Sequence, residues 1–269
     1  MAIATLDAYK AALGRQGQLV PVTIGSLTAS AGRSYDLWMY TAPKPSAPTT
    51  AVALNRTSAG ALGQFNAGSG LDLGVLGARF SAFAAANYIL VDRLSHQGGL
   101  SGTVATAQTT NLPTAALSRQ TSGVGVMVDL TIYSAVGTTA SSVSLSYTNS
   151  DGTSGRTSPS VAFGGSAFRK AGRNIHIPLQ EGDVGVRSVE SVTLAGTTGT
   201  VGNFGVTLYK PLFAVLIADT SGVLSAGGLI SGNTFGGVPL IEDDACLALQ
   251  GYMSSTNISA AGTLLVSEF

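Results

Sequence analysis

Hydrophobic and polar positions alternate through the middle of the chain, from Ser122 to Val161. Apolar residues fill every second position from Val124 to Ile132, and this period of two predicts a strand with one buried face. A second alternating run, Val143 to Tyr147, leads to an Asp151–Gly152 step that suits a tight hairpin turn. A third run, Arg156 to Phe163, can return alongside the second. The pattern therefore predicts an antiparallel sheet.

The N-terminal part of the chain gives weaker signals. Ile3 to Leu13 is the best helix candidate, because Thr5 can cap its start and Gly14 can end it. The apolar runs Leu19–Ile24 and Leu37–Tyr40 predict short strands around a loop rich in glycine and serine.

Three prolines lie within Thr41–Thr50, where they restrict the backbone and remove hydrogen-bond donors. This segment is expected to be a linker or a docked arm. Because proline has already reduced the entropy that docking costs, we predict that the arm lies on a neighbouring subunit rather than hanging free. Further on, the spacing of Phe80 and Phe83 favours a short helix over Ala78–Ala86.

The remaining apolar runs predict strands, and most are bounded by glycine-rich or serine-rich turns. Gly98–Arg119 is expected to be a long loop with at most brief strands. The predicted strands are Tyr88–His96, Asn174–Leu179, Ser188–Leu194, Phe204–Leu208, Phe213–Ile217, Cys246–Tyr252 and Thr263–Val266.

Many short strands with frequent turns indicate a mainly β protein, an antiparallel sandwich or jelly roll with a short N-terminal helix and extended arms. We divide the chain into residues 1–40 (helix and short strands), 41–50 (proline-rich arm), 51–218 (sandwich core) and 219–269 (a C-terminal β segment).

The amino-acid composition indicates the partners that a protein of this fold can have. Only 10% of the 269 residues are charged, and the formal net charge is zero. Interfaces lose charge from their centres, so a charge-poor β protein is expected to assemble with other copies of itself. No basic field is present for nucleic acid. The longest apolar run, Leu212–Ala218, is too short to span a membrane, and the N-terminus has no signal-peptide pattern.

The residues that could carry chemistry are sparse. The sequence has two histidines, and neither has an obvious carboxylate partner. On a strand, Asp92 and His96 would share a face but lie about 13 Å apart, so we expect His96 to have a packing or hydrogen-bonding role. His176 is expected on an edge strand. We predict no catalytic residue and no cofactor.

Metal ligands and nucleophile motifs are also missing from the sequence. Glu242–Asp244 is the only acidic run and favours a solvated loop over a cation site, and Asn149–Gly152 is explained by a hairpin turn. The single Cys246 excludes an internal disulfide framework and fits a reducing compartment. Arg169, Lys170 and Arg173 favour a solvated loop.

A few charges stand among apolar strands: Asp92, Arg93, Arg156 and Arg187. Buried charges have to be paired, so arginine–carboxylate bridges between strands or subunits are one expectation and a solvated strand edge is the other.

Several stretches over about residues 40–215 resemble a family of structural proteins from the virions of tailed bacteriophages. They include Val91–His96, Thr106–Thr109, Gly123–Val126, Ser146–Asn149, Gly155–Thr157, Gly182–Asp183 with Gly185–Val189, and Leu208–Leu212. The resemblance implies a virion component made in the cytoplasm of a host bacterium. It carries no active-site residues.

The sequence thus leads to a non-enzymatic virion protein, foremost a capsid decoration or accessory protein that binds the major capsid or other virion proteins. One alternative is a tail, neck or collar component. Another is a carbohydrate-binding sandwich, for which Trp38 is the only tryptophan available as a sugar platform. A hydrolase is the least favoured interpretation.

Overall fold

Antiparallel strands form nearly all the regular structure in the computed structural model, which describes residues 14–15, 17–82, 86–113, 116–217 and 239–269. One short 3-10 helix, η1 (Leu37–Tyr40), accompanies them. The prediction of a mainly β, antiparallel, sandwich-like fold is confirmed. The predicted helix Ile3–Leu13 lies outside the described residues.

The strands form three sheets. The four-stranded sheet has the order β1 (Gly17–Thr28), β16 (Asn257–Glu268), β4 (Leu73–Ala82), β14 (Leu240–Ile241). The five-stranded sheet has the order β10 (Val161–Gly164), β8 (Ala140–Asn149), β12 (Val186–Leu194), β6 (Gln108–Leu112), with β9 (Arg156–Thr157) beside β8. The seven-stranded sheet has the order β11 (Asn174–His176), β7 (Met127–Ser134), β13 (Asn203–Ile217), β5 (Ala86–Ser101), β15 (Leu247–Met253), β2 (Arg33–Asp36), with β3 (Val52–Ala53) beside β5.

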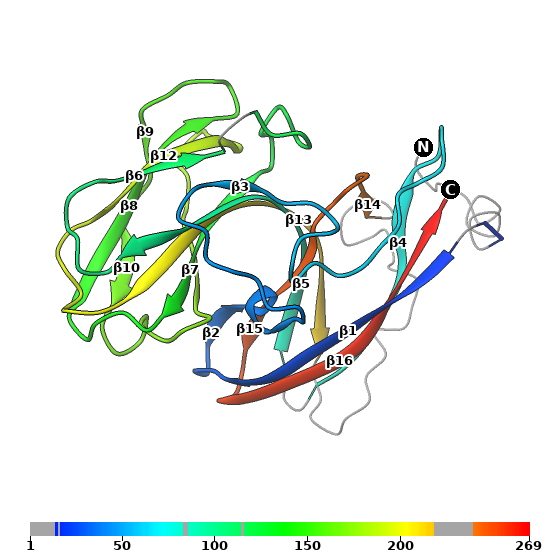
Figure 1. Ribbon diagram of the computed structural model, residues 1–269, viewed down its shortest axis with the longest axis horizontal. Coiled ribbons are helices and arrows are strands. Elements are labelled where there is room, and N and C mark those ends of the chain that lie inside the picture. The colour runs from blue at the N-terminus through cyan, green and yellow to red at the C-terminus, as the bar shows by residue number, and fades with distance from the viewer. Residues whose placement is uncertain (1–13, 16, 83–85, 114–115, 218–238) are drawn as a thin grey trace.

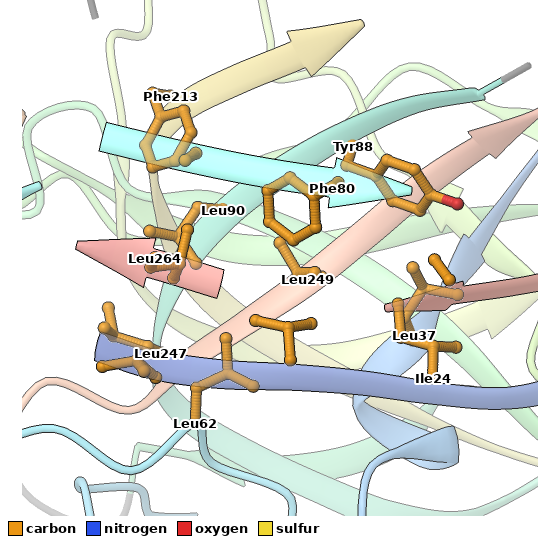
Figure 2. Packing of buried hydrophobic residues seen from close by; sticks show 14 of the residues in the cluster. Ile24, Leu37, Leu62, Phe80, Tyr88, Leu90, Phe213, Leu247, Leu249 and Leu264 are labelled. Carbon is orange, nitrogen blue, oxygen red and sulfur yellow. The ribbon is translucent and has the colours of Figure 1, made fainter. Parts of the chain in front are cut away.

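Two lobes share the seven-stranded sheet (Figure 1). In the first lobe, β7 and the first half of β13 face the five-stranded sheet across an apolar core that includes Val128, Leu145 and Phe204. In the second lobe, β15, the first half of β5 and the second half of β13 face the four-stranded sheet. Figure 2 shows the core of this second lobe, where Phe80, Leu249 and Leu264 converge from three strands.

Strands β5 and β13 are long enough to serve both cores. Phe204 and Leu208 of β13 pack in the first core, whereas Phe213 of the same strand packs in the second. The ladder between β13 and β5 shifts register between Leu208 and Tyr209 and again between Pro211 and Phe213. Bulges of this kind redirect side chains, so one strand can supply two cores that lie on different faces.

The alternating centre of the sequence folds as predicted, with β9 and then β10 returning along β8. The four apolar side chains from Val126 to Ile132 are fully buried in the first core. The opposite face of β7 is not solvated either, since Asp129 and Thr131 are 1% and 0% exposed. The middle of this strand is therefore covered on both faces.

Two predicted secondary-structure elements are wrong. Leu37–Tyr40 is the helix η1 rather than a strand, because the Asp36 carboxylate accepts a hydrogen bond from the Trp38 backbone N at 3.3 Å and caps the turn. Three successive side chains from Leu37 are buried there, which a strand with one buried face does not allow.

Ala78–Ala86 is not a helix over the residues described. Its first part belongs to β4, where Ala78 and Phe80 are buried and Arg79 between them is exposed. The partner of this strand is β16, about 180 residues further along the chain, with Phe80 paired to Gly262. Local spacing could not reveal a pairing partner at that distance.

The proline-rich segment 41–50 docks on β5 of its own chain, whereas the sequence analysis placed it on a neighbouring subunit. Gly98 N donates to Pro48 O at 2.6 Å. A Cβ at Gly98 would lie 2.9 Å from Ala47, and one at Gly99 would lie 2.9 Å from Thr49. The two glycines of β5 therefore allow the arm to approach its backbone.

Candidate functional site: buried polar networks and a surface hollow

Ionisable side chains gather on the face of the seven-stranded sheet that is turned away from the first core. The most deeply buried pair is Asp36 with Arg93, whose Nη1 donates to Asp36 Oδ2 at 2.6 Å while both side chains are 1% exposed. Thr131 Oγ1 donates to the same carboxylate oxygen at 2.8 Å. The Arg93 guanidinium also stacks 4.0 Å from the ring of Trp38. Stacking and pairing together hold this charge in the interior.

His96 extends this network instead of joining Asp92. Its Nδ1 lies 3.0 Å from Thr207 Oγ1, which also accepts from Arg93 Nη2, and its Nε2 lies 2.5 Å from Tyr133 OH. Complete burial, helped by the charge of Arg93, holds the pKa of His96 well below its usual value. The imidazole is neutral at pH 7 and has the hydrogen-bonding role expected from the sequence.

Asp92 has a different partner, Arg119. Arg119 Nε and Nη2 each lie 3.0 Å from the Asp92 carboxylate, and Cys246 N donates to it at 2.8 Å. Arg119 Nη2 also donates to Leu54 O, which ties the segment after β3 to β5. Sequence reasoning gave no signal for Arg119, which lies outside any strand pattern.

Asp129 forms the third network, and this one reaches the surface. The buried carboxylate accepts from Asn174 Nδ2 and Gln250 Nε2 at 2.8 Å each and from His176 Nδ1 at 3.0 Å. The hydrogen bond to Asp129 raises the pKa of His176, whose side chain is 55% exposed on the edge strand β11. A carboxylate-oriented imidazole at a surface can accept or donate a proton.

A surface hollow of about 450 Å³ opens beside His176. Met127 and the chain from Ile177 to Val184 line it, and Val184 is 61% exposed at its rim. No serine, threonine or cysteine belongs to the described residues that line it. The Asp129–His176 pair therefore has no hydroxyl or thiol of these three residue types beside it in the hollow, which is the nucleophile that such a pair activates in acyl transfer.

One wall of the hollow is fixed by Asp183. Its carboxylate accepts from Arg156 Nε at 3.0 Å, from Tyr147 OH at 2.5 Å and from Asn149 Nδ2 at 2.7 Å. These hydrogen bonds, led by that of Arg156, lower the pKa of Asp183 to about 2. The cluster ties the loop 177–185 to the hairpin of β8 and β9.

Of the four charges expected in arginine–carboxylate bridges, Asp92, Arg93 and Arg156 form them, all between strands or loops of one chain. Arg187 does not. It is exposed and donates through Nε to Ser122 O at 3.2 Å, which matches the solvated-edge alternative.

The other sequence candidates lie where a structural role is sufficient. Asn149 Oδ1 accepts from Asp151 N and Thr153 N and so stabilises the hairpin turn. The acidic run Glu242–Asp244 is exposed between β14 and β15. Burial raises the pKa of the free thiol of Cys246 to about 12.

Within the described ranges, no group of three or more potential ligands could hold a metal ion. In the same ranges, no helix has the length and apolarity needed to cross a membrane.

Comparisons with known proteins leave the family open. No family model matches the chain, and no curated protein matches it. Among solved structures, the chain is similar to the VP2 subviral particle of infectious bursal disease virus, with 10% identity over 95% of this chain and 81% of that one and a TM-score of 0.20. T=1 particles derived from infectious bursal virus give 10% identity, 94% and 78% coverage and a TM-score of 0.19. At these scores the likeness assigns neither a fold family nor a function.

Proposed function

We propose that the chain is a non-enzymatic structural protein of a bacteriophage virion, attached to the capsid as a decoration or accessory protein and acting through protein–protein contacts. The proposal rests on the resemblance of residues 40–215 to phage virion proteins and on the distribution of charge in the structure.

The location of the ionisable side chains is the observation that carries the proposal. Arg93 and Arg119 are buried against Asp36 and Asp92, in a chain with only 10% charged residues. These buried ion pairs take part of the charge into the interior and so reduce further the charge on the surface. Protein interfaces have this character, because charges are depleted at their centres.

Large apolar side chains on the surface support the same function. In the described part of the chain, Leu19, Val184 and Tyr252 are 66%, 61% and 54% exposed. They lie on three separate elements, namely β1, the loop before β12, and β15. Several apolar contact points on a rigid β scaffold suit a subunit that touches more than one neighbour.

The alternatives differ in what the surface must provide. A carbohydrate platform needs exposed aromatic rings, but Trp38 is 2% exposed and Tyr252 is the only aromatic residue among the large, well-exposed hydrophobic side chains of the described ranges. A tail, neck or collar position uses the same kind of interface as a capsid position, so only the particle itself separates these two.

The test is the composition of the particle. The phage that encodes this chain is purified by density gradient, capsids and tails are separated, and each fraction is quantified by mass spectrometry. We expect the chain in the capsid fraction at a fixed copy number relative to the major capsid protein. Its presence in tails would favour the alternative position, and its absence from purified virions would refute the proposal.

A matched variant separates binding from catalysis. His176→Ala removes the exposed half of the Asp129–His176 carboxylate–imidazole pair, which borders the hollow. We expect particles with this variant to form and infect like the wild type. Normal assembly with loss of a hydrolytic activity would show that the non-enzymatic interpretation is wrong.

A further inference from the structure

Arg173 is a buried arginine without a carboxylate. In the part of the chain that the structure describes, Arg93, Arg119 and Arg173 are 0%, 8% and 5% exposed. The first two are paired with aspartates, whereas Arg173 donates through Nη1 only to Ser34 O at 2.9 Å, and its Nε has no partner. A buried charge that lacks a counter-ion is costly, so the site favours the approach of an anion.

Arg33 lies close to Arg173, and Lys170 is three residues before Arg173 in the same loop. Arg33 and Arg173 both stack on Phe168, with guanidinium carbons 5.0 Å and 5.2 Å from the ring centroid. Lys170, in the same loop as Arg173, donates to Ala29 O at 2.8 Å. None of the three forms an ion pair with a described carboxylate. Burial lowers the pKa of Arg173 to about 10, so it is still charged at pH 7.

We name Arg33, Lys170 and Arg173, with Phe168 and Tyr252 beside them, the basic end. Tyr252 is 54% exposed and lies on β15, where it pairs with Ser34 of β2. Arginine and tyrosine are the residues that dominate binding energy at protein interfaces. The sequence analysis predicted a solvated loop for Arg169, Lys170 and Arg173, which is wrong for Arg173 because its side chain is buried. Arg33 and Tyr252 join this group through the pairing of β2 with β15.

A complementary surface lies at the other end of β15. Glu242, Asp243 and Asp244 are exposed just before this strand, and Leu240 beside them is 48% exposed. We name these four residues the acidic end. Asp244 pairs with Arg56 at 3.0 Å, but Glu242 contacts only the neutral Gln120, and Asp243 accepts from the Ala67 backbone N. Two of the three carboxylates therefore have no cationic partner among the described residues.

The two ends cannot neutralise each other within one chain. The seven residues of β15 separate them, which is roughly 20 Å of strand. That distance exceeds the Debye length of about 8 Å at physiological ionic strength. Figure 1 shows β14, next to the acidic end, and β2, next to the basic end, toward opposite ends of β15.

We propose that the basic end of one chain binds the acidic end of a second copy, so that copies associate head to tail. A contact between two different surfaces of the same protein closes into a ring or continues as a filament, depending on the rotation between copies. The proposal deepens the structural function above by assigning the surfaces used between copies, and it rests on that function. It also gives a binding role to the positive and negative side chains that lie at separate ends of a chain whose net charge is zero.

Charge reversal tests this geometry directly. Variant one, Arg33→Glu with Lys170→Glu, makes both ends acidic, and variant two, Glu242→Lys with Asp243→Lys, makes both ends basic. Neither variant alone should associate, but an equimolar mixture restores the contact between an acidic and a basic surface. Lys44→Glu, on the exposed arm, is the matched control and should associate like the wild type.

The measurement is sedimentation velocity of the full chain at low and at physiological salt, with thermal unfolding to verify that each variant is folded. We expect the wild-type Kd to rise at least about tenfold over this range, because exposed charges are screened. A wild type that stays monomeric, single variants that still associate, or a mixture that stays dissociated would each overturn the inference. Incorporation into virions is measured separately, so a chain found in particles without this self-association would retain the proposed function.

Discussion

Removal of the Asp36 carboxylate should reveal how much the fold depends on its buried charges. In Asp36→Asn, the amide oxygen can still accept from Trp38 N, but an NH₂ group replaces the oxygen that Arg93 and Thr131 contact at 2.6 and 2.8 Å. Arg93 is then an uncompensated charge that is 0% exposed. Loss of one partner of such a pair costs about 3–5 kcal/mol. This is a large part of the roughly 5–15 kcal/mol that stabilises a typical domain.

The assay is urea unfolding at pH 7, followed by the fluorescence of Trp38. This is the only tryptophan, and its ring lies 4.0 Å from the Arg93 guanidinium, so its signal reports on the site itself. Asp151→Asn, at an exposed hairpin position, is the matched control and should change the free energy of unfolding by less than about 0.5 kcal/mol.

A double variant distinguishes the cost of losing the ion pair from the cost of leaving one of its charges buried and unpaired. Asp36→Leu with Arg93→Met removes both charges, and we expect it to be more stable than either single variant, because no unpaired ion is left behind. If Asp36→Asn unfolds with the same free energy as Asp151→Asn, the reasoning is refuted. It is also refuted if the double variant loses the full sum of the two single losses.

Two further predictions concern β7 and the wall of the hollow. Val128→Asp and Thr131→Asp should both prevent folding, since each puts a new charge at a position that is 0% exposed, whereas Ser134→Asp at an exposed position of the same strand should be tolerated in thermal unfolding. A mild Thr131→Asp would mean that the second face of β7 is open to solvent. The pKa of Asp183 is lowered to about 2, so its stabilising effect is present above the unfolded value of about 3.9 and is lost as the pH falls through about 2. Asp183→Asn should therefore lower stability at pH 7 and flatten the acid limb of a stability–pH curve, and an unchanged limb would contradict this.

Period-two patterns predicted the strands well because they report a local property. The apolar residues at every second position from Val126 to Ile132 are buried, as their spacing indicated, but Val124 at the start of the pattern lies before β7 and is 49% exposed. The same pattern misled about the other face of β7. Its alternation suggested that Asp129 and Thr131 face solvent. Both side chains are buried instead, and their polar atoms form hydrogen bonds with side chains of other strands.

The networks could not be predicted from the sequence, since their members are far apart in it. Asp36 and Arg93 are separated by 57 positions, and Asp129 and Gln250 by 121. The sequence did indicate that charges such as Arg93 would need partners, but it could not name them. The basic end was missed for the same reason, because Arg33 meets Phe168 only through tertiary packing.

The shared strands β5 and β13 have a mechanical consequence. They are antiparallel neighbours over most of their length, and each enters both cores. A load applied to one lobe is transmitted to the other as shear along this ladder, where many hydrogen bonds must yield together rather than one after another. We expect the molecule to resist stretching as one body, with a single rupture event and no early release of either lobe.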